Sequence, residues 1–459
     1  MDEDFFKSEE DLRKALEAGG GPGYGSTGGR ALIPEDIDSS VVMALQAHQA
    51  DFKMMNLLKK EPVNSPVHEY TREKGTGSEN IFYDEGEEVA EDQVDIERVA
   101  RKSKYMQTYR SVTMQLNRAK TITDAVAVEK EAGILHLMKN IESTLFHGDE
   151  SINPKQFDSI PNMIKRESKK AGFDTTFDLR GATLAEKGDY AIDAVAQIVN
   201  EAGGTLTHSM MPPAMAGDLQ LCLKDRLLLT PNDKAALNVP LIYPTMYGDN
   251  IIVSGLEGGS NKFYRMKGKI KPSTVADVPA APTVSGNPET GATGSRFAGS
   301  DAGAYWYQVH AFDKKGHFSA AATVDAAVTV ASGGKVTLTI SGGDNKAIGY
   351  VICRSVKDAA DASNCYEMVR VPRDPSGTTT VVDLNEDLPG TGEMLLLSMG
   401  GFNQSIRWQQ FLPATKVDMF ATKSLIVPFI IAMFGTPDVR VPWYNGLIKN
   451  IGWTKSAFK

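Results

Sequence analysis

The most regular hydrophobic pattern in the chain runs from residue 123 to residue 148, where apolar side chains recur at offsets of three and four. These side chains are Ile134, Leu137, Met138, Ile141 and Leu145. Their spacing gathers them on one stripe of an α-helix, with Thr123 or Asp124 placed to cap its first turn and Gly148 placed to end it in a left-handed turn. The pattern predicts a rod of roughly 37 Å. Because burial of the stripe contributes on the order of 10 kcal/mol, we expect the rest of the chain to pack on this rod.

Shorter helical patterns lie on both sides of the rod. Residues 8–18 and 38–58 are predicted helices joined by a glycine-rich tether. After the rod, Thr183 and Glu186 have the spacing of a capping box in front of another predicted helix. Strand and helix patterns alternate here, which predicts a compact α+β unit.

Two strand-like runs before the rod, residues 67–72 and 94–116, flank an acidic segment. In the second run, alternate positions fall on one face: Met106, Thr108, Arg110, Val112, Met114 and Leu116. Residues 75–97 contain no lysine or arginine, and their acidic side chains include Asp84, Glu85, Glu87 and Glu88. Two strands joined by so long and acidic a loop predict a ribbon that projects outward. A solvated surface loop is the alternative interpretation.

The pattern changes again near Pro272. From there to about Gly390 the chain is rich in small and β-branched residues, with short strand patterns separated by turn signals. About 115 residues of this kind are typical of an antiparallel β-sandwich. Long apolar strand patterns then return between Phe411 and Trp453, so we interpret the sandwich as an insertion that projects from the surface of its parent unit.

Composition and charge narrow the class of protein. The 459 residues are 41% hydrophobic, enough for real cores, and the formal net charge of −9 provides no overall positive field for nucleic acid or an anionic membrane. Three scattered cysteines favour free thiols in a reducing compartment. The acidic N-terminus lacks the pattern of a secretory signal, and the longest apolar run, residues 425–434, is too short to span a bilayer. We therefore expect a soluble protein that is made in the cytosol.

Motifs for catalysis or cofactor binding are weak. Residues 23–28 match G-x-G-x-x-G, but they lie in the tether rather than between a strand and a helix. His136 and His147 have no second histidine at metal-binding spacing, so helix capping is the preferred role of His147. The aromatic run Tyr305–Tyr307 suggests core packing more than a sugar platform. We predict no enzyme activity, no metal and no cofactor.

Basic side chains form two local groups that matter for assembly. One is the run Lys165, Arg166, Lys169 and Lys170, and the other is Arg98, Arg101, Lys102 and Lys104. A solvated loop is one interpretation of the first group. The other is that one of these groups receives the acidic ribbon of a neighbouring copy of the chain.

The order of these parts resembles a tailed-bacteriophage major capsid protein, whose fold is shared with the herpesvirus capsid floor. The resemblance rests on the arm, the ribbon, the run SKYMQTYRSVTMQL entering the long helix, and the phrase HGDESINPKQFDSIPNMI after it. Gly148-Asp149-Glu150 and Ile160-Pro161-Asn162 stand where the family has a GDG-type motif and its close. The inserted sandwich resembles an immunoglobulin or fibronectin type III module, with PAAPT at residues 279–283.

The resemblance implies an α+β tailed-phage capsid fold that assembles in the host cytoplasm and resides in the virion. Its implied division is an N-terminal arm (1–60), an extended loop with leading strands (61–118), a peripheral domain (119–182), a central axial domain (183–271), the sandwich (272–390), and returning strands (391–459). Implied partners are copies of the chain in hexamers and pentamers, with portal, scaffold and decoration proteins. The shell would enclose double-stranded DNA without sequence-specific binding and without a membrane.

Two other functions fit parts of the sequence. One is a phage tail or baseplate protein whose sandwich binds host-surface glycans. The other is a secreted multi-domain hydrolase, although no signal peptide, paired carboxylates or nucleophile motif supports it.

Overall fold

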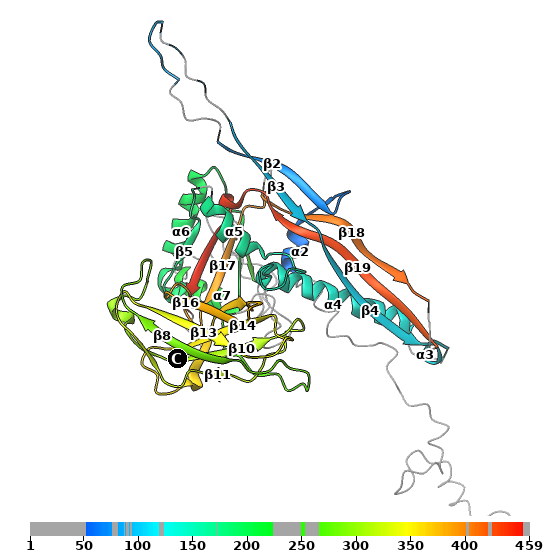
Figure 1. The fold of residues 1–459 in the computed structure, drawn as a ribbon. Helices are drawn as coiled ribbons and strands as arrows, with labels where there is room; N and C mark the ends of the chain where they lie inside the picture. Colours follow the sequence, from blue (N-terminus) through cyan, green and yellow to red (C-terminus); the bar gives the residue numbers. More distant parts are fainter. Residues whose placement is uncertain are drawn as a thin grey trace, which may run out of the picture.

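The computed structural model describes residues 52–75, 81–86, 88, 91, 94–118, 124–170, 172–223, 249–252, 266–400, 404–420 and 425–452. The described part is a mixed α+β chain with three hydrophobic clusters of fifteen or more buried residues. Figure 1 shows three parts of the chain: an elongated sheet with a long helix, a smaller sheet with helices, and a β-sandwich beneath. The predicted helix at 8–18, the tether and most of the predicted helix at 38–58 lie outside the described residues.

The elongated sheet has the strand order β1-β18-β19-β4. Its strands are β1 (Lys59–Pro62), β18 (Ile406–Asp418), β19 (Ile426–Val439) and β4 (Lys104–Thr113). The predicted return of apolar strands near the C-terminus therefore pairs with a strand from before the long helix, since β19 lies antiparallel to β4. On β4 the predicted face is confirmed from Met106 to Val112, where alternate side chains are buried or half-buried.

The long helix α4 spans Ala125–His147 and lies along one side of this sheet (Figure 1). The Asp124 carboxylate accepts a hydrogen bond of 3.0 Å from the Val126 N–H, which confirms the predicted cap. The predicted left-handed turn at Gly148 is wrong, because its φ is −64°. Glycine is needed there for space, since a Cβ would lie 2.6 Å from the carbonyl oxygen of Phe157.

The predicted stripe of α4 faces the main core. Leu137, Ile141 and Leu145 are buried, and Ile134 and Met138 are partly buried against the same cluster. A Cβ on Gly133 would lie 2.6 Å from Ile431 of β19, so the glycine allows close approach of helix and sheet.

The predicted ribbon is present. It consists of β2 (Val67–Gly75) and β3 (Asp95–Lys102), paired antiparallel, and Figure 1 shows it leading away from the elongated sheet. The single strand predicted over 94–116 is wrong in two places. It breaks at the buried Ser103, whose N–H donates to the Pro66 carbonyl oxygen at 2.8 Å. It also ends before helix α3 (Met114–Arg118), which leaves Met114 and Leu116 exposed.

The smaller sheet has the order β5-β20-β17-β6-β7. Its strands are β5 (Thr176–Asp178), β20 (Gly446–Ile451), β17 (Gly392–Leu397), β6 (His208–Met211) and β7 (Asp249–Ile252). Helix α6 (Leu184–Glu201) packs on it, together with α7 (Pro213–Leu223). The capping box is confirmed, with the Thr183 N–H donating to the Glu186 carboxylate at 3.1 Å.

Residues 283–383 form a β-sandwich. One sheet has the order β11-β10-β14-β15, formed by Ala322–Thr323, Tyr307–Phe312, Gly349–Ser355 and Cys365–Pro372. The facing sheet has the order β16-β13-β8, formed by Thr378–Asp383, Lys335–Ser341 and Thr283–Glu289. The pair β12 (Val328–Val330) and β9 (Gly303–Tyr305) lies beside them. One cluster of buried side chains joins β9, β10, β12, β13, β14 and β15, and partly buried side chains of β8 and β16 pack against it.

The sandwich is tied to the smaller sheet where the chain enters and leaves it. The Lys267 N–H donates to the Thr391 carbonyl oxygen at 2.9 Å, so the two connecting segments lie side by side. Arg180 donates to the carbonyl oxygen of Asn385 and to the carboxylate of Asp301. The module is thus held against its neighbour as well as inserted into it.

Leu145 provides a test of the central helix. Its side chain is fully buried, and Leu145→Ala should lower the free energy of unfolding by about 2–5 kcal/mol, because the lost contacts leave a cavity. Chemical denaturation measures the change. The matched control Leu116→Ala removes a side chain that is 48% exposed and should change stability by less than about 0.5 kcal/mol. Equal effects of the two variants would contradict the central place of α4.

Candidate assembly interface

The root of the ribbon is fixed by ion pairs between buried or half-buried arginines and carboxylates from distant parts of the chain. Arg72 of β2 pairs with Glu97 of β3 at 2.7 Å and with Glu167 at 3.2 Å. Glu167 belongs to α5 (Ile160–Lys170) and also pairs with Arg101 of β3 at 2.5 Å. One buried carboxylate therefore joins both strands of the ribbon to a helix of the body.

Asp438 at the end of β19 is the second centre of this network. Its carboxylate is fully buried and accepts hydrogen bonds from the Tyr70 hydroxyl at 3.0 Å, from Gln409 at 2.9 Å and from Arg101 at 3.2 Å. Arg440 lies 3.5 Å from the same carboxylate and 2.6 Å from Glu61. The ribbon root thus contacts the elongated sheet as well as α5.

The pKa values of Tyr70, Arg72 and Arg101 are all raised, which moves them further from neutral pH. Burial lowers the pKa of Arg101, but the charge of Glu167 and its hydrogen bond raise it by more, so the net shift is upward. The same balance raises the pKa of Arg72, with Glu97 and Glu167 as the partners. Burial, followed by the charge of Asp438, raises the pKa of the Tyr70 hydroxyl, which therefore stays neutral. We name these side chains together the root network: Glu61, Tyr70, Arg72, Glu97, Arg101, Glu167, Asp438 and Arg440.

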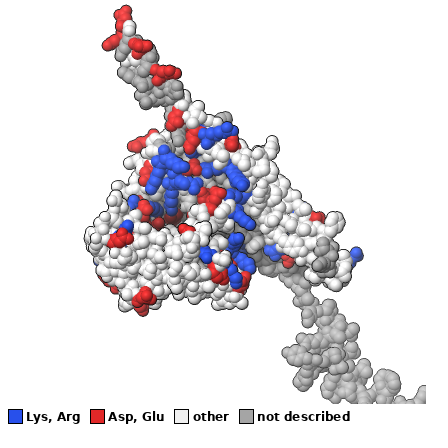
Figure 2. Space-filling model, in the orientation of Figure 1, with Lys and Arg blue, Asp and Glu red and all other residues white. Residues whose placement is uncertain are grey.

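The far end of the ribbon is acidic and partly apolar. Asp84, Glu85 and Glu88 are exposed there, whereas Glu87 lies outside the described residues. Ile81 and Phe82 are 81% and 79% exposed, and Figure 1 shows this end standing clear of the body. Figure 2 shows the acidic side chains at this end in red.

The predicted basic side chains divide into two groups in the structure. Arg98 pairs with Glu69, Arg101 with Glu167, Lys165 with Glu393 at 2.7 Å, and Arg166 with Asp158 at 2.7 Å. Lys102, Lys169 and Lys170 are exposed, and no ion pair holds them within the described part of the chain. The run at 165–170 forms the C-terminal half of α5, so its interpretation as a loop is wrong.

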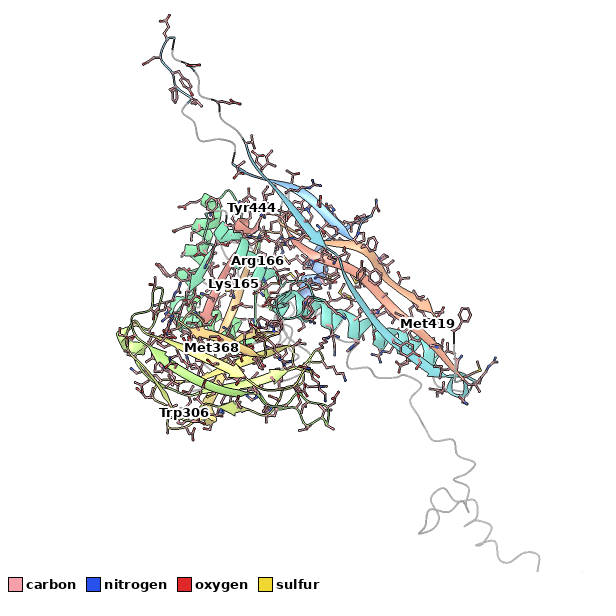
Figure 3. All side chains as sticks on the ribbon, viewed as in Figure 1. Lys165, Arg166, Trp306, Met368, Met419 and Tyr444 are labelled. Atoms are coloured by element: carbon pink, nitrogen blue, oxygen red, sulfur yellow. The ribbon has the colours of Figure 1, made fainter. Side chains whose placement is uncertain are left out.

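Figure 2 shows lysine and arginine gathered on the middle of one face, between the sandwich and the ribbon. Lys165 and Arg166 lie in this region (Figure 3). Burial lowers the pKa of Lys165, but the charges of Glu393 and Asp387 raise it by more. Lys165 is therefore engaged within the chain, which leaves the end of α5 as the accessible basic surface.

Sequence reasoning missed the acidic partners of the root network. Glu167 interrupts the basic run, and an acid inside such a run is the only local sign of an ion-pair centre. Asp438 and Tyr70 lie 368 residues apart, and nothing in the local pattern links them. Long-range pairs of this kind follow from the strand order rather than from spacing.

The aromatic residues and cysteines that the sequence analysis singled out have structural roles. Tyr305 and Tyr307 are buried in the sandwich and Trp306 is partly buried against the same cluster, which confirms the predicted core packing. The three cysteines are free thiols. Among the described residues, no cluster of three metal-ligating side chains occurs and no helix is long and apolar enough to cross a membrane. The G-x-G-x-x-G match and its tether lie outside the described residues.

Solved structures similar to this chain come from protein shells and phages. They include the holo-SrpI encapsulin complex of Synechococcus elongatus PCC 7942, with 11% identity, coverage of 93% of this chain and 95% of that chain, and a TM-score of 0.43. The capsid of an empty GTA particle has 8% identity, coverage of 92% and 97%, and a TM-score of 0.47. A Mycobacterium phage Adephagia structure has 7% identity, coverage of 91% and 95%, and a TM-score of 0.44. No family model and no curated protein matches the sequence.

With TM-scores below 0.5, these similarities carry no weight for the function of this chain.

Glu167 provides a test of the root network. Glu167→Gln leaves Arg72 and Arg101 buried without the carboxylate that they share, and should lower the free energy of unfolding by about 3–5 kcal/mol. Denaturation in urea measures this. Glu69→Gln removes the same charge from a pair whose side chains are 41% and 77% exposed, and should cost less than about 1 kcal/mol. A loss at Glu167 no larger than at Glu69 would show that the network does not hold the ribbon.

Proposed function

We propose that this chain is the major subunit of a self-assembling protein shell, and specifically the capsid of a tailed bacteriophage. The observation that carries the proposal is the ribbon, whose root is locked by buried charges while its tip exposes Ile81 and Phe82. Exposed apolar side chains on a rigidly aimed projection favour a protein partner. In a shell made of one kind of subunit, that partner is a second copy of the chain.

The rest of the architecture supports a structural subunit. The long helix and elongated sheet form a stiff plate, and α5 carries exposed basic side chains at its end. The order of arm, ribbon, long helix and central unit resembles the tailed-phage capsid pattern. A net charge of −9 also suits a container whose DNA must leave again, because a strongly basic wall would retain phosphates.

We further propose that Lys102, Lys169 and Lys170 receive the ribbon tip of a neighbouring copy. These are exposed members of the predicted basic set for which the described residues supply no ion pair, whereas Arg98, Arg101, Lys165 and Arg166 each pair with a carboxylate of the same chain. Opposite charges on the tip and on the receiver steer the two surfaces together and set their register.

The division of the chain follows the same proposal. The arm covers 1–60, the extended loop 61–118, the peripheral domain 119–182, the axial domain 183–271, and the returning strands 391–459. Residues 272–390 would be an immunoglobulin-like or fibronectin-like module on the outside of the particle. In this arrangement the sandwich is an accessory to the shell rather than its framework.

Electron microscopy of the purified full-length chain tests the function. Closed shells are the expected product, assembled from hexamers and pentamers. Rings, tubes or fibres would instead favour a tail or baseplate protein, and a monomer under all assembly conditions would reject the proposal. Nuclease-resistant DNA in particles from the natural source would support a phage head, and shells without DNA would favour a compartment for other cargo.

The ribbon tip can be tested by charge reversal. The double variant Glu85→Lys, Glu88→Lys should reduce the yield of closed particles by roughly tenfold or more, because like charges would meet at the receiver. Light scattering and microscopy measure the yield. The double variant Glu201→Lys, Asp325→Lys makes the same charge change at exposed sites outside the ribbon and should assemble normally. Normal yield from the ribbon variant would refute its role.

A further inference from the structure

A carboxyl group on the long helix holds the segment where the chain enters the body. Glu142 of α4 is completely buried. Its two carboxyl oxygens accept hydrogen bonds from the Met54 N–H at 2.7 Å and from the Met55 N–H at 3.0 Å. These donors belong to the first turn of α2 (Lys53–Leu57), which therefore begins on a side chain 87 or 88 residues away.

Residues 52–58 are also held by apolar packing, in addition to the hydrogen bonds to Glu142. Met54 and Met55 are 0% and 1% exposed and belong to the main hydrophobic cluster, together with Phe52 and Leu58. The last carbonyl of α2, that of Leu57, accepts a hydrogen bond from Gln404. Residues 1–51 join the body through this segment, so its docking determines where they are attached.

Unlike the carboxylates of the root network, Glu142 pairs with no lysine or arginine among the described residues. Burial raises the pKa of Glu142 to about 7, and the two backbone N–H groups lower it by less. The other ionisable side chains of α2 and β1 are Lys53, Lys59, Lys60 and Glu61, and those of α4 are Glu129, Lys130, Glu131, His136, Lys139 and His147. None of them contributes to the shift. Ionisation of Glu142 is unfavourable, because its negative charge would lie in an apolar core with only the two N–H hydrogen bonds from the described residues to stabilise it.

The sign of the pH effect follows from linkage. The pKa of Glu142 is higher when the segment is docked than the ordinary value of 4.5 in water. The docked state therefore binds the proton more tightly, so docking is strongest below the ordinary value and weakens as pH rises through about 7. The neutral carboxyl still accepts an N–H at its carbonyl oxygen.

We propose that Glu142 is a proton-controlled anchor, which holds residues 52–58 on α4 when it is protonated and loosens them when it is ionised. The anchor is a property of the folded chain and does not depend on the proposed shell function. It places the attachment of residues 1–51 under control of pH close to neutrality.

Amide hydrogen exchange on the purified full chain tests the anchor. With exchange rates corrected for their intrinsic pH dependence, protection of residues 52–58 should fall by roughly tenfold or more between about pH 5 and pH 8, since one pKa unit corresponds to a factor of ten. Residues of α6 provide the internal control and should not follow the same curve. Constant protection of 52–58 across this range would overturn the proposal.

The matched variant is Glu142→Gln, which keeps the shape of the side chain but cannot ionise. Its protection of residues 52–58 should not change with pH over the same range, whatever its absolute level. A pH dependence equal to that of the wild-type chain would assign the effect to another group and overturn the proposal. If the variant does not fold, the wild-type series with its α6 control still decides the question.

Discussion

The arrangement of the ribbon on the body depends on a network of ion pairs at the ribbon root. A two-stranded ribbon is marginal alone in water, and its direction relative to a body is undefined unless something holds both strands. Here Glu167 binds an arginine from each strand, and Asp438 binds Arg101 and the Tyr70 hydroxyl. Removal of one partner would leave an unpaired charge in the interior, which is strongly unfavourable. The ion pairs therefore fix the direction in which the two strands leave the body.

Glu142 illustrates the opposite use of a buried carboxyl group. The root network surrounds its acids with guanidinium groups, whose pKa values rise as a result. Within the described part of the chain, Glu142 is paired with two backbone N–H groups and no cation, and burial raises its pKa to about 7. The two sites differ in that arginines pair with the acids of the root network, whereas no described cation pairs with Glu142. The arginines of the root network stay charged across the neutral range, whereas the proposed anchor at Glu142 is expected to change its charge within it.

Local patterns in the sequence were enough to predict most elements, and their limits have physical causes. The period of α4, the capping box at Thr183 and Glu186, and the strands of the sandwich depend on neighbours close in sequence, so spacing reveals them. Helix α5 was missed because its basic half looks like a loop until Ile160, Met163 and Ile164 are seen to be buried. The turn at Gly148 was predicted wrongly because contact with Phe157 determines it. The acidic and basic sets were found, but their partners, such as Asp438 for Arg101, required the tertiary structure.

The adjoining connections of the sandwich have a consequence for how this chain could vary. Because Lys267 and Thr391 are joined by a hydrogen bond, the segment between them starts and finishes at nearly the same point. A change in the length of that segment therefore leaves the separation of the strands below unchanged, because both of its ends stay at one place on the body.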